Sequence, residues 1–340
     1  MQLSEIEFYL NGPRGKWKDA IVKQLVEITD GWETEIYAFD VESTKNNKRC
    51  TEELVIRMYA GPWAKHKARK EGNLLRRLHG ADYPVPMVSL IEEDASHLGH
   101  PFVVMERIDG VQMWKLLDSE EEDSGLYHMF CTLFYDLHKL EWHQLVEDPK
   151  EAQGLDSKKA ILQWIEKFED RAKEVGILEI LKIVEWLREE IERVAFEELS
   201  ATHNDFHPSN ILIDKRGKPF VIDWTAADLM DYRVDLAWTL LLAKIYAGDS
   251  MRKAILEGYE KASRKAVEGL RFFEVLGALR RLTDILVSLD ASSEGVGLRD
   301  GAAEMIREQL DHNITVLDII WSHTGLELSQ VRDLMTRGKI

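Results

Sequence analysis

The stretch "HNDFHPSNILIDKRGKPFVIDW", residues 203–224, decides the fold of this chain. It holds two short β-branched apolar runs, "ILI" at 211–213 and "FVI" at 220–222, on either side of a polar segment with one glycine. Apolar runs of this kind that flank a glycine-containing turn are typical of a β-hairpin. Histidine, aspartate and asparagine side chains gather around its open end. The stretch therefore predicts a hairpin that presents polar groups.

The expected strand register places two of these polar groups side by side. If Ile213 faces Phe220, Asn210 stands opposite Asp223, and directly opposed residues have Cβ atoms roughly 4.5–5.5 Å apart. An amide oxygen and a carboxylate suit Mg²⁺, which takes few protein oxygens and completes its shell with water and substrate phosphates. Taken singly, each residue is explained as well by a strand end or a turn. The pairing predicts a metal site.

The segment that precedes the hairpin adds a catalytic pattern. From His203 to Asn210 it matches H-x-D-x-x-x-x-N, the loop of phosphoryl-transfer enzymes. In such a loop the aspartate accepts the proton of the attacking hydroxyl, and the asparagine and a later aspartate hold the metal. The spacing predicts Asp205 as the catalytic residue and Asn210 and Asp223 as ligands of Mg²⁺.

Length and composition bound the class of protein. The chain has 340 residues and a formal net charge of −17. Single cores rarely grow beyond about 250–300 residues, so we expect two lobes. The acidity disfavours binding to nucleic acid or anionic membranes. Because the chain has two cysteines, no apolar run of eighteen residues and no signal-like N-terminus, we expect a cytoplasmic protein.

The first hundred residues alternate between helical and strand-like patterns. We expect helices at 16–28 and 65–79, and strands at 35–41, 53–59 and 100–110. The polar residues 42–51 indicate a hairpin loop. After Gly110 the helical spacing dominates, as in 180–194 and 275–289. The predicted β-hairpin is the exception in this second, mostly helical part.

Together these motifs resemble the aminoglycoside phosphotransferase and choline kinase family, relatives of the protein kinases. The resemblance rests on "HNDFHPSNILID", "VIDW" and "DYRVDLAW" (231–238). It implies an α+β, bilobal, protein-kinase-like fold. A small N-terminal nucleotide-binding lobe with an antiparallel sheet would span 1–106, and a larger helical C-terminal lobe with the catalytic loop and substrate site would span 107–340. The implied activity is transfer of the γ-phosphate of ATP to a hydroxyl of a small substrate.

The first lobe offers a charged pair. Arg57 is the charged residue of an otherwise apolar strand segment, and Glu71 shares a helical face with Ala68 and Leu75. Burying either charge is costly unless it has a partner, so we expect the two to pair. The resemblance implies that the pair places the nucleotide phosphates. Arg57 departs from the protein-kinase pattern, which has lysine at this strand position. The alternative role for the pair of Arg57 and Glu71 is a salt bridge that is purely structural.

Further roles follow from the resemblance alone. The hinge between the lobes, with Met105, Glu106 and Ile108, would offer backbone groups to adenine. Asp235 would brace the catalytic loop; alternatively, it is an ordinary carboxylate at a helix N-terminus. The expected phosphate loop contains only Gly31.

Three rival interpretations remain. His203, Asp205 and His207 alternate, so in extended chain they could bind zinc or iron in a hydrolase. A protein kinase is disfavoured because seven residues, "WTAADLM", separate Asp223 from Asp231 and leave no room for a peptide platform. A nucleotide-binding pseudokinase is the third. The sequence leaves open the small hydroxyl-bearing acceptor, the choice of ATP or GTP and the oligomeric state.

Overall fold

The structure is a computed structural model. It describes residues 2–28, 34–117, 124–147, 152–289 and 314–337. Gly31, the glycine of the expected phosphate loop, lies outside this part. No helix in the described part of the chain is both long and apolar enough to span a bilayer.

The chain divides into two compact units. The first contains Met1–Val111 and Ile211–Thr225, and the second contains Gln112–Asn210 and the described residues from Ala226 onward. The predicted hairpin thus groups with the first unit, although the chain enters it from the second.

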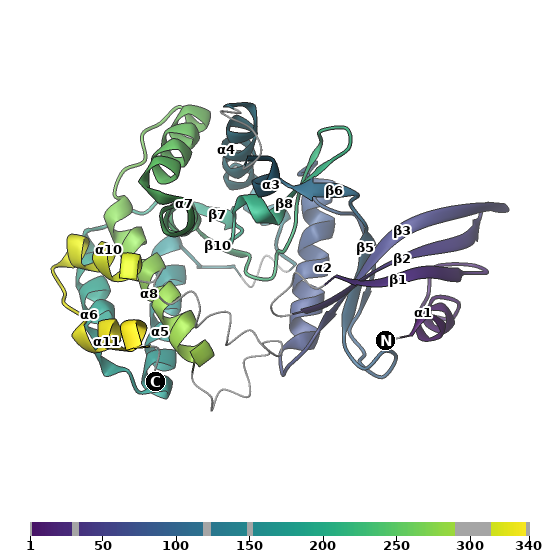
Figure 1. Ribbon diagram of the computed structural model, residues 1–340, viewed down its shortest axis with the longest axis horizontal. Helices are drawn as coiled ribbons and strands as arrows, with labels where there is room; N and C mark the ends of the chain where they lie inside the picture. The colour runs from purple at the N-terminus through teal and green to yellow at the C-terminus, as the bar shows by residue number, and fades with distance from the viewer. Residues whose placement is uncertain (1, 29–33, 118–123, 148–151, 290–313, 338–340) are drawn as a thin grey trace. The chain divides into compact units, whose positions relative to one another are not determined.

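The first unit is built on a five-stranded antiparallel sheet with the order β1-β2-β3-β5-β4. Its strands are β1 (Ile21–Ile28), β2 (Thr34–Lys45), β3 (Lys48–Tyr59), β4 (Val88–Glu92) and β5 (Phe102–Glu106). Because side chains alternate along a strand, Leu54 and Ile56 of β3 pack in the cluster that includes α1 (Leu3–Leu10), whereas Arg57 faces α2 (Ala64–Gly80). The two helices lie on opposite faces of the sheet (Figure 1).

The helix expected at 16–28 is wrong, because residues 21–28 form β1 and residues 16–20 precede it as irregular chain. The pairing of β1 with β2 shifts between Lys23 and Val26, and Gln24 has a φ of 55°. Such a bulge inserts an extra residue and interrupts the alternation of a strand. Apolar residues on either side of it therefore take a spacing that resembles a helix.

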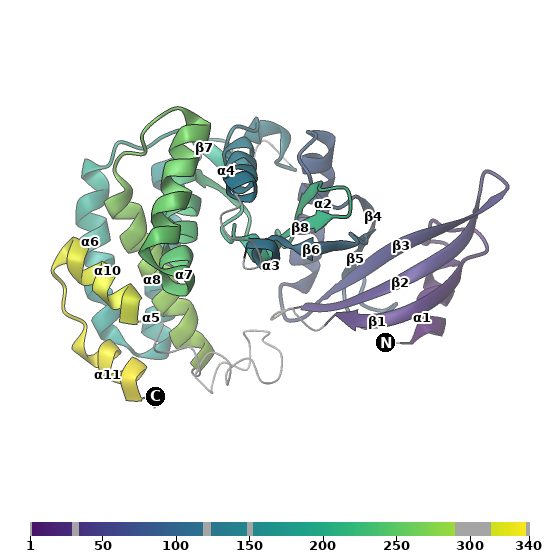
Figure 2. The same ribbon diagram turned by 45° about the horizontal axis from the view of Figure 1, so that its top comes forward.

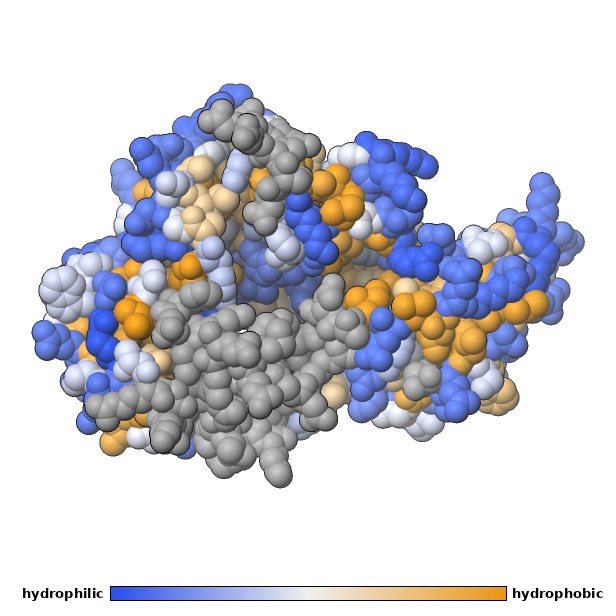
Figure 3. All heavy atoms as spheres, viewed as in Figure 1, coloured by the Kyte–Doolittle hydropathy of each residue, from blue (hydrophilic) through white to orange (hydrophobic). Residues whose placement is uncertain are grey.

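The loop expected at 42–51 is much shorter than predicted. β2 and β3 continue to the pair Lys45–Lys48, and Asn46 and Asn47 alone form the turn, with φ of 51° and 60°. Asparagine tolerates this left-handed conformation, which two-residue hairpin turns require. The end of the hairpin is hydrophilic (Figure 3), which is why its strands look like a loop in the sequence.

The decisive stretch forms the predicted hairpin, with a register one residue away from the expected one. The three-stranded sheet β6-β8-β9 contains β6 (Gly110–Gln112), β8 (Ile211–Asp214) and β9 (Pro219–Val221). Ile211 pairs with Val221 rather than with Ile222. The predicted pairing of Asn210 with Asp223 is therefore wrong by one residue.

The turn of the hairpin explains this shift. The backbone N–H of Asp214 donates to the carbonyl of Lys218 at 3.0 Å. The Asp214 carboxylate accepts from the backbone N–H groups of Arg216 and Lys218, both at 2.8 Å, and Gly217 has a φ of 79°. These contacts leave three residues, 215–217, in the turn where six were expected. Asp214 therefore stands opposite Lys218 rather than Pro219, and the register of the strands shifts by one residue.

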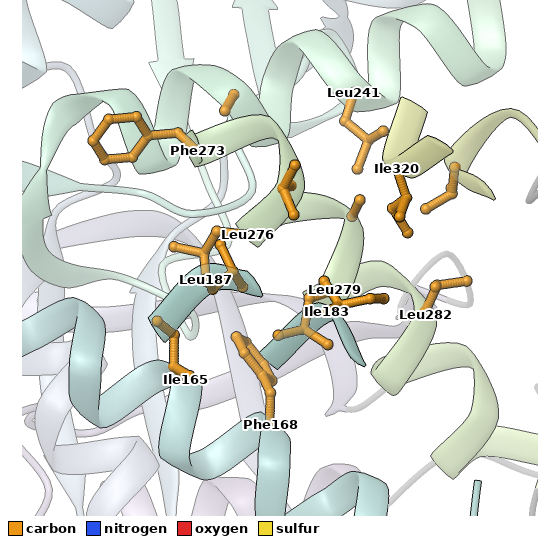
Figure 4. Packing of buried hydrophobic residues seen from close by; sticks show 14 of the residues in the cluster. Ile165, Phe168, Ile183, Leu187, Leu241, Phe273, Leu276, Leu279, Leu282 and Ile320 are labelled. Carbon is orange, nitrogen blue, oxygen red and sulfur yellow. The ribbon is translucent and has the colours of Figure 1, made fainter. Parts of the chain in front are cut away.

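The second unit is mostly helical, as predicted. Its helices include α3 (Met113–Leu117), α4 (Ser124–His138), α5 (Ser157–Val175), α6 (Leu181–Glu190), α7 (Tyr232–Ser263), α8 (Leu270–Leu289), α10 (Ile314–Thr324) and α11 (Ser329–Arg337). In its core Leu279 of α8 lies with Ile183 of α6 and near Phe168 of α5 (Figure 4). The short strands β7 (Leu199–Thr202) and β10 (Asp228–Asp231) pair antiparallel beside the helices, and α7 lies next to α8 (Figure 2).

We predict that Gly110→Ala destabilises the protein. A Cβ at Gly110 would lie 2.7 Å from the backbone oxygen of Ile213 in the hairpin, and such overpacking costs about 1–3 kcal/mol. At Gly80, the last residue of α2, a Cβ would meet nothing within 4 Å, so Gly80→Ala is the matched control. Urea unfolding should show a lower free energy of unfolding for Gly110→Ala only. Equal stability of the two variants would contradict the close approach.

Candidate functional site

Arg57 is buried between two carboxylates. Its side chain is 9% exposed, its Nη1 lies 3.1 Å from Oε1 of Glu71, and its Nη2 lies 2.7 Å from Oδ1 of Asp223. The predicted pair of Arg57 and Glu71 is present. The sequence did not reveal that Arg57 also binds Asp223, the predicted metal ligand. The guanidinium fork allows both contacts, because it carries donors on separate nitrogens.

Glu71 is held from three sides. Besides Arg57, its carboxylate accepts from the hydroxyl of Tyr59 at 2.5 Å and from the backbone N–H of Trp224 at 3.2 Å. Burial raises the pKa of Glu71, against the opposing charge of Arg57. Burial also raises the pKa of Tyr59 well above its ordinary value. The phenol therefore keeps its proton and donates to the carboxylate.

Asp223 combines an anchored carboxylate with access to solvent. It has a φ of 64°, and its Oδ1 accepts from Arg57 and from the hydroxyl of Thr225 at 3.0 Å. Its side chain is nevertheless 40% exposed. An incoming ligand can therefore reach this carboxylate.

In the second unit, Asp205 has a donor on each carboxylate oxygen. Oδ1 accepts from the indole N–H of Trp238 at 3.1 Å, and Oδ2 accepts from the amide of Asn210 at 3.2 Å. Burial alone would raise the pKa of Asp205, but the neighbouring His207, Arg280 and Trp238 outweigh burial and hold the pKa well below its usual range. Asp205 is thus an ionised carboxylate at neutral pH, and its side chain is 34% exposed.

The amide of Asn210 has a defined orientation. Its Nδ2 lies 2.9 Å from the backbone oxygen of Asp205 and 3.2 Å from the Asp205 carboxylate. Both atoms are acceptors, so the nitrogen must face them. The Oδ1 atom of Asn210 is then turned to the other side, where it could serve as a hard ligand for a cation.

Asp235 braces the loop that carries Asp205 from the first turn of α7. It is fully buried, and it accepts from the backbone N–H groups of His203 at 2.6 Å and Asn204 at 2.8 Å. His138 lies 3.3 Å from the same carboxylate. The predicted contact between Asp235 and the loop is therefore present in the structure.

The proposed zinc or iron site of a hydrolase is not formed. Asn204 has a φ of 61°, so the chain is not extended and alternate residues do not share one face. His203 is fully buried, and its ring packs against Phe206 with centroids 5.8 Å apart. Among the described residues, no cluster of three or more His, Cys, Asp or Glu side chains could hold a metal ion.

The predicted hinge runs from the end of β5, and some of its backbone groups already form hydrogen bonds within the sheet. Met105 pairs with Val55 within the sheet. The N–H of Glu106 donates to the carbonyl of Met87 at 2.9 Å, and the next N–H, of Arg107, donates to β3 at 3.0 Å. Ile108 follows beyond both strands.

Sequence reasoning missed several residues of the site. Tyr59 could have been found, because it lies two positions after Arg57 and therefore on the same face of β3. Trp238 and Arg280 could not, since the contacts that connect them to the loop join distant parts of the chain: Arg280 stacks on Trp238, with Cζ 3.8 Å from the ring centroid, and donates to the carbonyl of Asn204 at 2.6 Å.

Comparison with known proteins identifies a family. The model of the "Phosphotransferase enzyme family" matches residues 24–273. A curated relative, acyl-CoA dehydrogenase family member 10 of Mus musculus, is 24% identical over 184 residues, which are 52% of this chain and 17% of that protein. The chain thus spans less than a fifth of the length of this relative.

Solved structures show the same fold at low sequence identity. A putative aminoglycoside phosphotransferase of Ralstonia eutropha has a TM-score of 0.67 at 14% identity, covering 95% of this chain and 98% of its own. A choline/ethanolamine kinase family protein of Mesorhizobium loti has a TM-score of 0.62 at 14% identity, covering 99% of this chain and 98% of its own. A spectinomycin phosphotransferase in complex with ADP and spectinomycin has a TM-score of 0.57 at 12% identity, covering 96% of this chain and 99% of its own. The predicted α+β, protein-kinase-like fold is confirmed.

We predict that Asp235→Ala strongly destabilises the second unit. The change leaves two buried backbone N–H groups without their acceptor, and each such loss costs about 1–3 kcal/mol. Asp249→Ala, in α7 beyond the kink at Gly248, is the control because the Asp249 side chain is 81% exposed and pairs with Lys244 at the surface. Exposed ion pairs contribute about 0–1 kcal/mol. Denaturant unfolding should separate the two variants, and similar small losses would refute the bracing role.

Proposed function

Because the chain belongs to the phosphotransferase enzyme family, we propose that it is an ATP-dependent small-molecule kinase that transfers the γ-phosphate to a hydroxyl. The family confirms the coarser part of the predicted enzyme class, a phosphotransferase, and an alcohol group as the acceptor is part of the proposal. The observation that carries the finer proposal is Asp205: an ionised, partly exposed carboxylate whose two oxygens are fixed by Trp238 and Asn210.

The first unit is proposed to bind the nucleotide. Arg57 would bind and position the phosphates of the nucleotide, and the ion pair with Glu71 would hold Arg57 in place. The hinge residues Met105, Glu106 and Ile108 are proposed to offer backbone groups to adenine. Because the N–H of Glu106 already donates within the sheet, we expect the N–H of Ile108, rather than that of Glu106, to be a donor. The spectinomycin phosphotransferase of similar fold is in complex with ADP, which supports an adenine nucleotide as the ligand.

Asn210 and Asp223 are proposed as the ligands of Mg²⁺. An outward-turned amide oxygen and a partly exposed carboxylate are the hard oxygen donors that this ion takes, with phosphates and water completing its shell. The ion would neutralise charge on the phosphates when bound. Arg57 already neutralises part of the charge of Asp223, so the approach of a cation would weaken this ion pair.

Asp205 is proposed to orient the acceptor hydroxyl for in-line attack and to accept its proton. Phosphoryl transfer depends mainly on positioning and charge stabilisation, which suits a carboxylate of low pKa. A pseudokinase is the second candidate, because both terminal nitrogens of Arg57 are already bound to carboxylates. An ADP-release screen with hydroxyl-bearing metabolites and antibiotics would identify the acceptor and decide between the two functions.

The proposed site predicts nucleotide binding that depends on Mg²⁺. Titration calorimetry with a non-hydrolysable ATP analogue should show binding in Mg²⁺, weaker binding after EDTA, and recovery when Mg²⁺ is added back. Binding that ignores the metal, or no binding at all, would argue against Asn210 and Asp223 as ligands.

The role of Asp205 predicts a specific kinetic defect. A positioned general base contributes on the order of 10²–10⁴ in rate, but it does not hold the nucleotide. Asp205→Asn should therefore lower kcat by this factor, while the affinity for the Mg²⁺–ATP analogue stays near wild type. Asp318→Asn, at a surface ion pair with Arg332, is the control. A mutant with wild-type turnover would overturn the mechanism.

A further inference from the structure

We propose that Tyr59 is a positioning residue for nucleotide binding, which acts through Glu71 to fix the direction of Arg57. The inference rests on the proposed function of this site. Tyr59 is fully buried at the end of β3. Its hydroxyl donates to Oε2 of Glu71 at 2.5 Å, and its ring centroid lies 5.9 Å from the guanidinium carbon of Arg57. It therefore lies beside both members of the ion pair.

The two oxygens of Glu71 carry different contacts. Oε1 accepts from Arg57 at 3.1 Å and from the backbone N–H of Trp224 at 3.2 Å, whereas Oε2 accepts from Tyr59. A carboxylate can rotate about its terminal bond. The phenol on one oxygen keeps the other oxygen directed at Arg57 and at the backbone after the hairpin.

The orientation of Arg57 depends on this arrangement. Its Nη1 is used by Glu71, so Nη2 is presented to Asp223 at 2.7 Å. The fork of a guanidinium is rigid and planar, and rotation of the Glu71 carboxylate would therefore move both nitrogens together. Loss of the Tyr59 hydroxyl would let Arg57 turn away from the side where phosphates are expected.

A second pair in the same unit provides a matched comparison. Tyr9 is buried, and its hydroxyl donates to Glu92 at 2.7 Å, in a cluster with Arg14. This pair links α1 to β4, and Tyr9 packs in the cluster that contains Ile56 of β3, on the other face of the sheet from Arg57. Tyr9→Phe therefore removes a similar hydrogen bond from the same unit without touching the proposed site.

The test measures the dissociation constant of a non-hydrolysable ATP analogue in the presence of Mg²⁺. Urea unfolding of the same variants measures their stability. The free energy of a hydrogen bond to a charged group is large enough to change the dissociation constant about tenfold. Tyr59→Phe should weaken binding about tenfold, whereas Tyr9→Phe should leave it within about twofold at similar stability. Equal binding by both variants would overturn the role of Tyr59. Absence of binding by the wild type would instead refute the proposed function.

A double-mutant cycle with Glu71→Gln tests whether Tyr59 acts through Glu71. The effects of substitutions at residues that act as one unit do not add. In the Glu71→Gln background, Tyr59→Phe should therefore change the dissociation constant by less than about twofold. If its tenfold effect persists in full, Tyr59 acts by another route and the inference fails. A variant with lost stability but unchanged affinity would show that the hydroxyl is merely structural.

Discussion

The burial of Arg57 between two carboxylates is the constraint on which the first unit depends. A guanidinium inside a sheet face requires partners, because an unpaired buried charge is very costly. The structure supplies Glu71 from α2 and Asp223 from the segment after the hairpin. One side chain thus connects β3, a helix and a segment 166 residues away in the sequence. The ion pairs that satisfy Arg57 also position the groups proposed to meet the nucleotide.

The second unit solves a similar problem with backbone donors. Asp235 is a buried carboxylate on α7, and the N–H groups of His203 and Asn204 donate to it. Hydrogen bonds to an ionised acceptor are stronger than those between neutral groups. The loop that carries Asp205 is therefore fixed by its main chain, while Trp238 and Asn210 fix the carboxylate itself.

Low identity to the solved structures limits what similarity contributes. At 12–14% identity the comparisons show the fold, whereas the assignment of roles rests on contacts in this chain. Spacing alone predicted Asp205 and Asn210, and the search for a buried partner predicted Arg57 with Glu71. The contact of Arg57 with Asp223 was not predicted, because no local pattern reports the approach of segments so distant in sequence.

The sequence by itself determined the hairpin, the helical second part and the order of the phosphoryl-transfer motif, since these depend on local spacing of apolar and polar residues. Only the tertiary structure decided the strand register, where the side chain of Asp214 closes a shorter turn. It also decided that 16–28 contains a strand, because a bulge at Gln24 gives a strand the spacing of a helix. The spacing of apolar residues does not report these features, because they depend on side-chain-to-backbone hydrogen bonds within a turn and on single backbone dihedral angles.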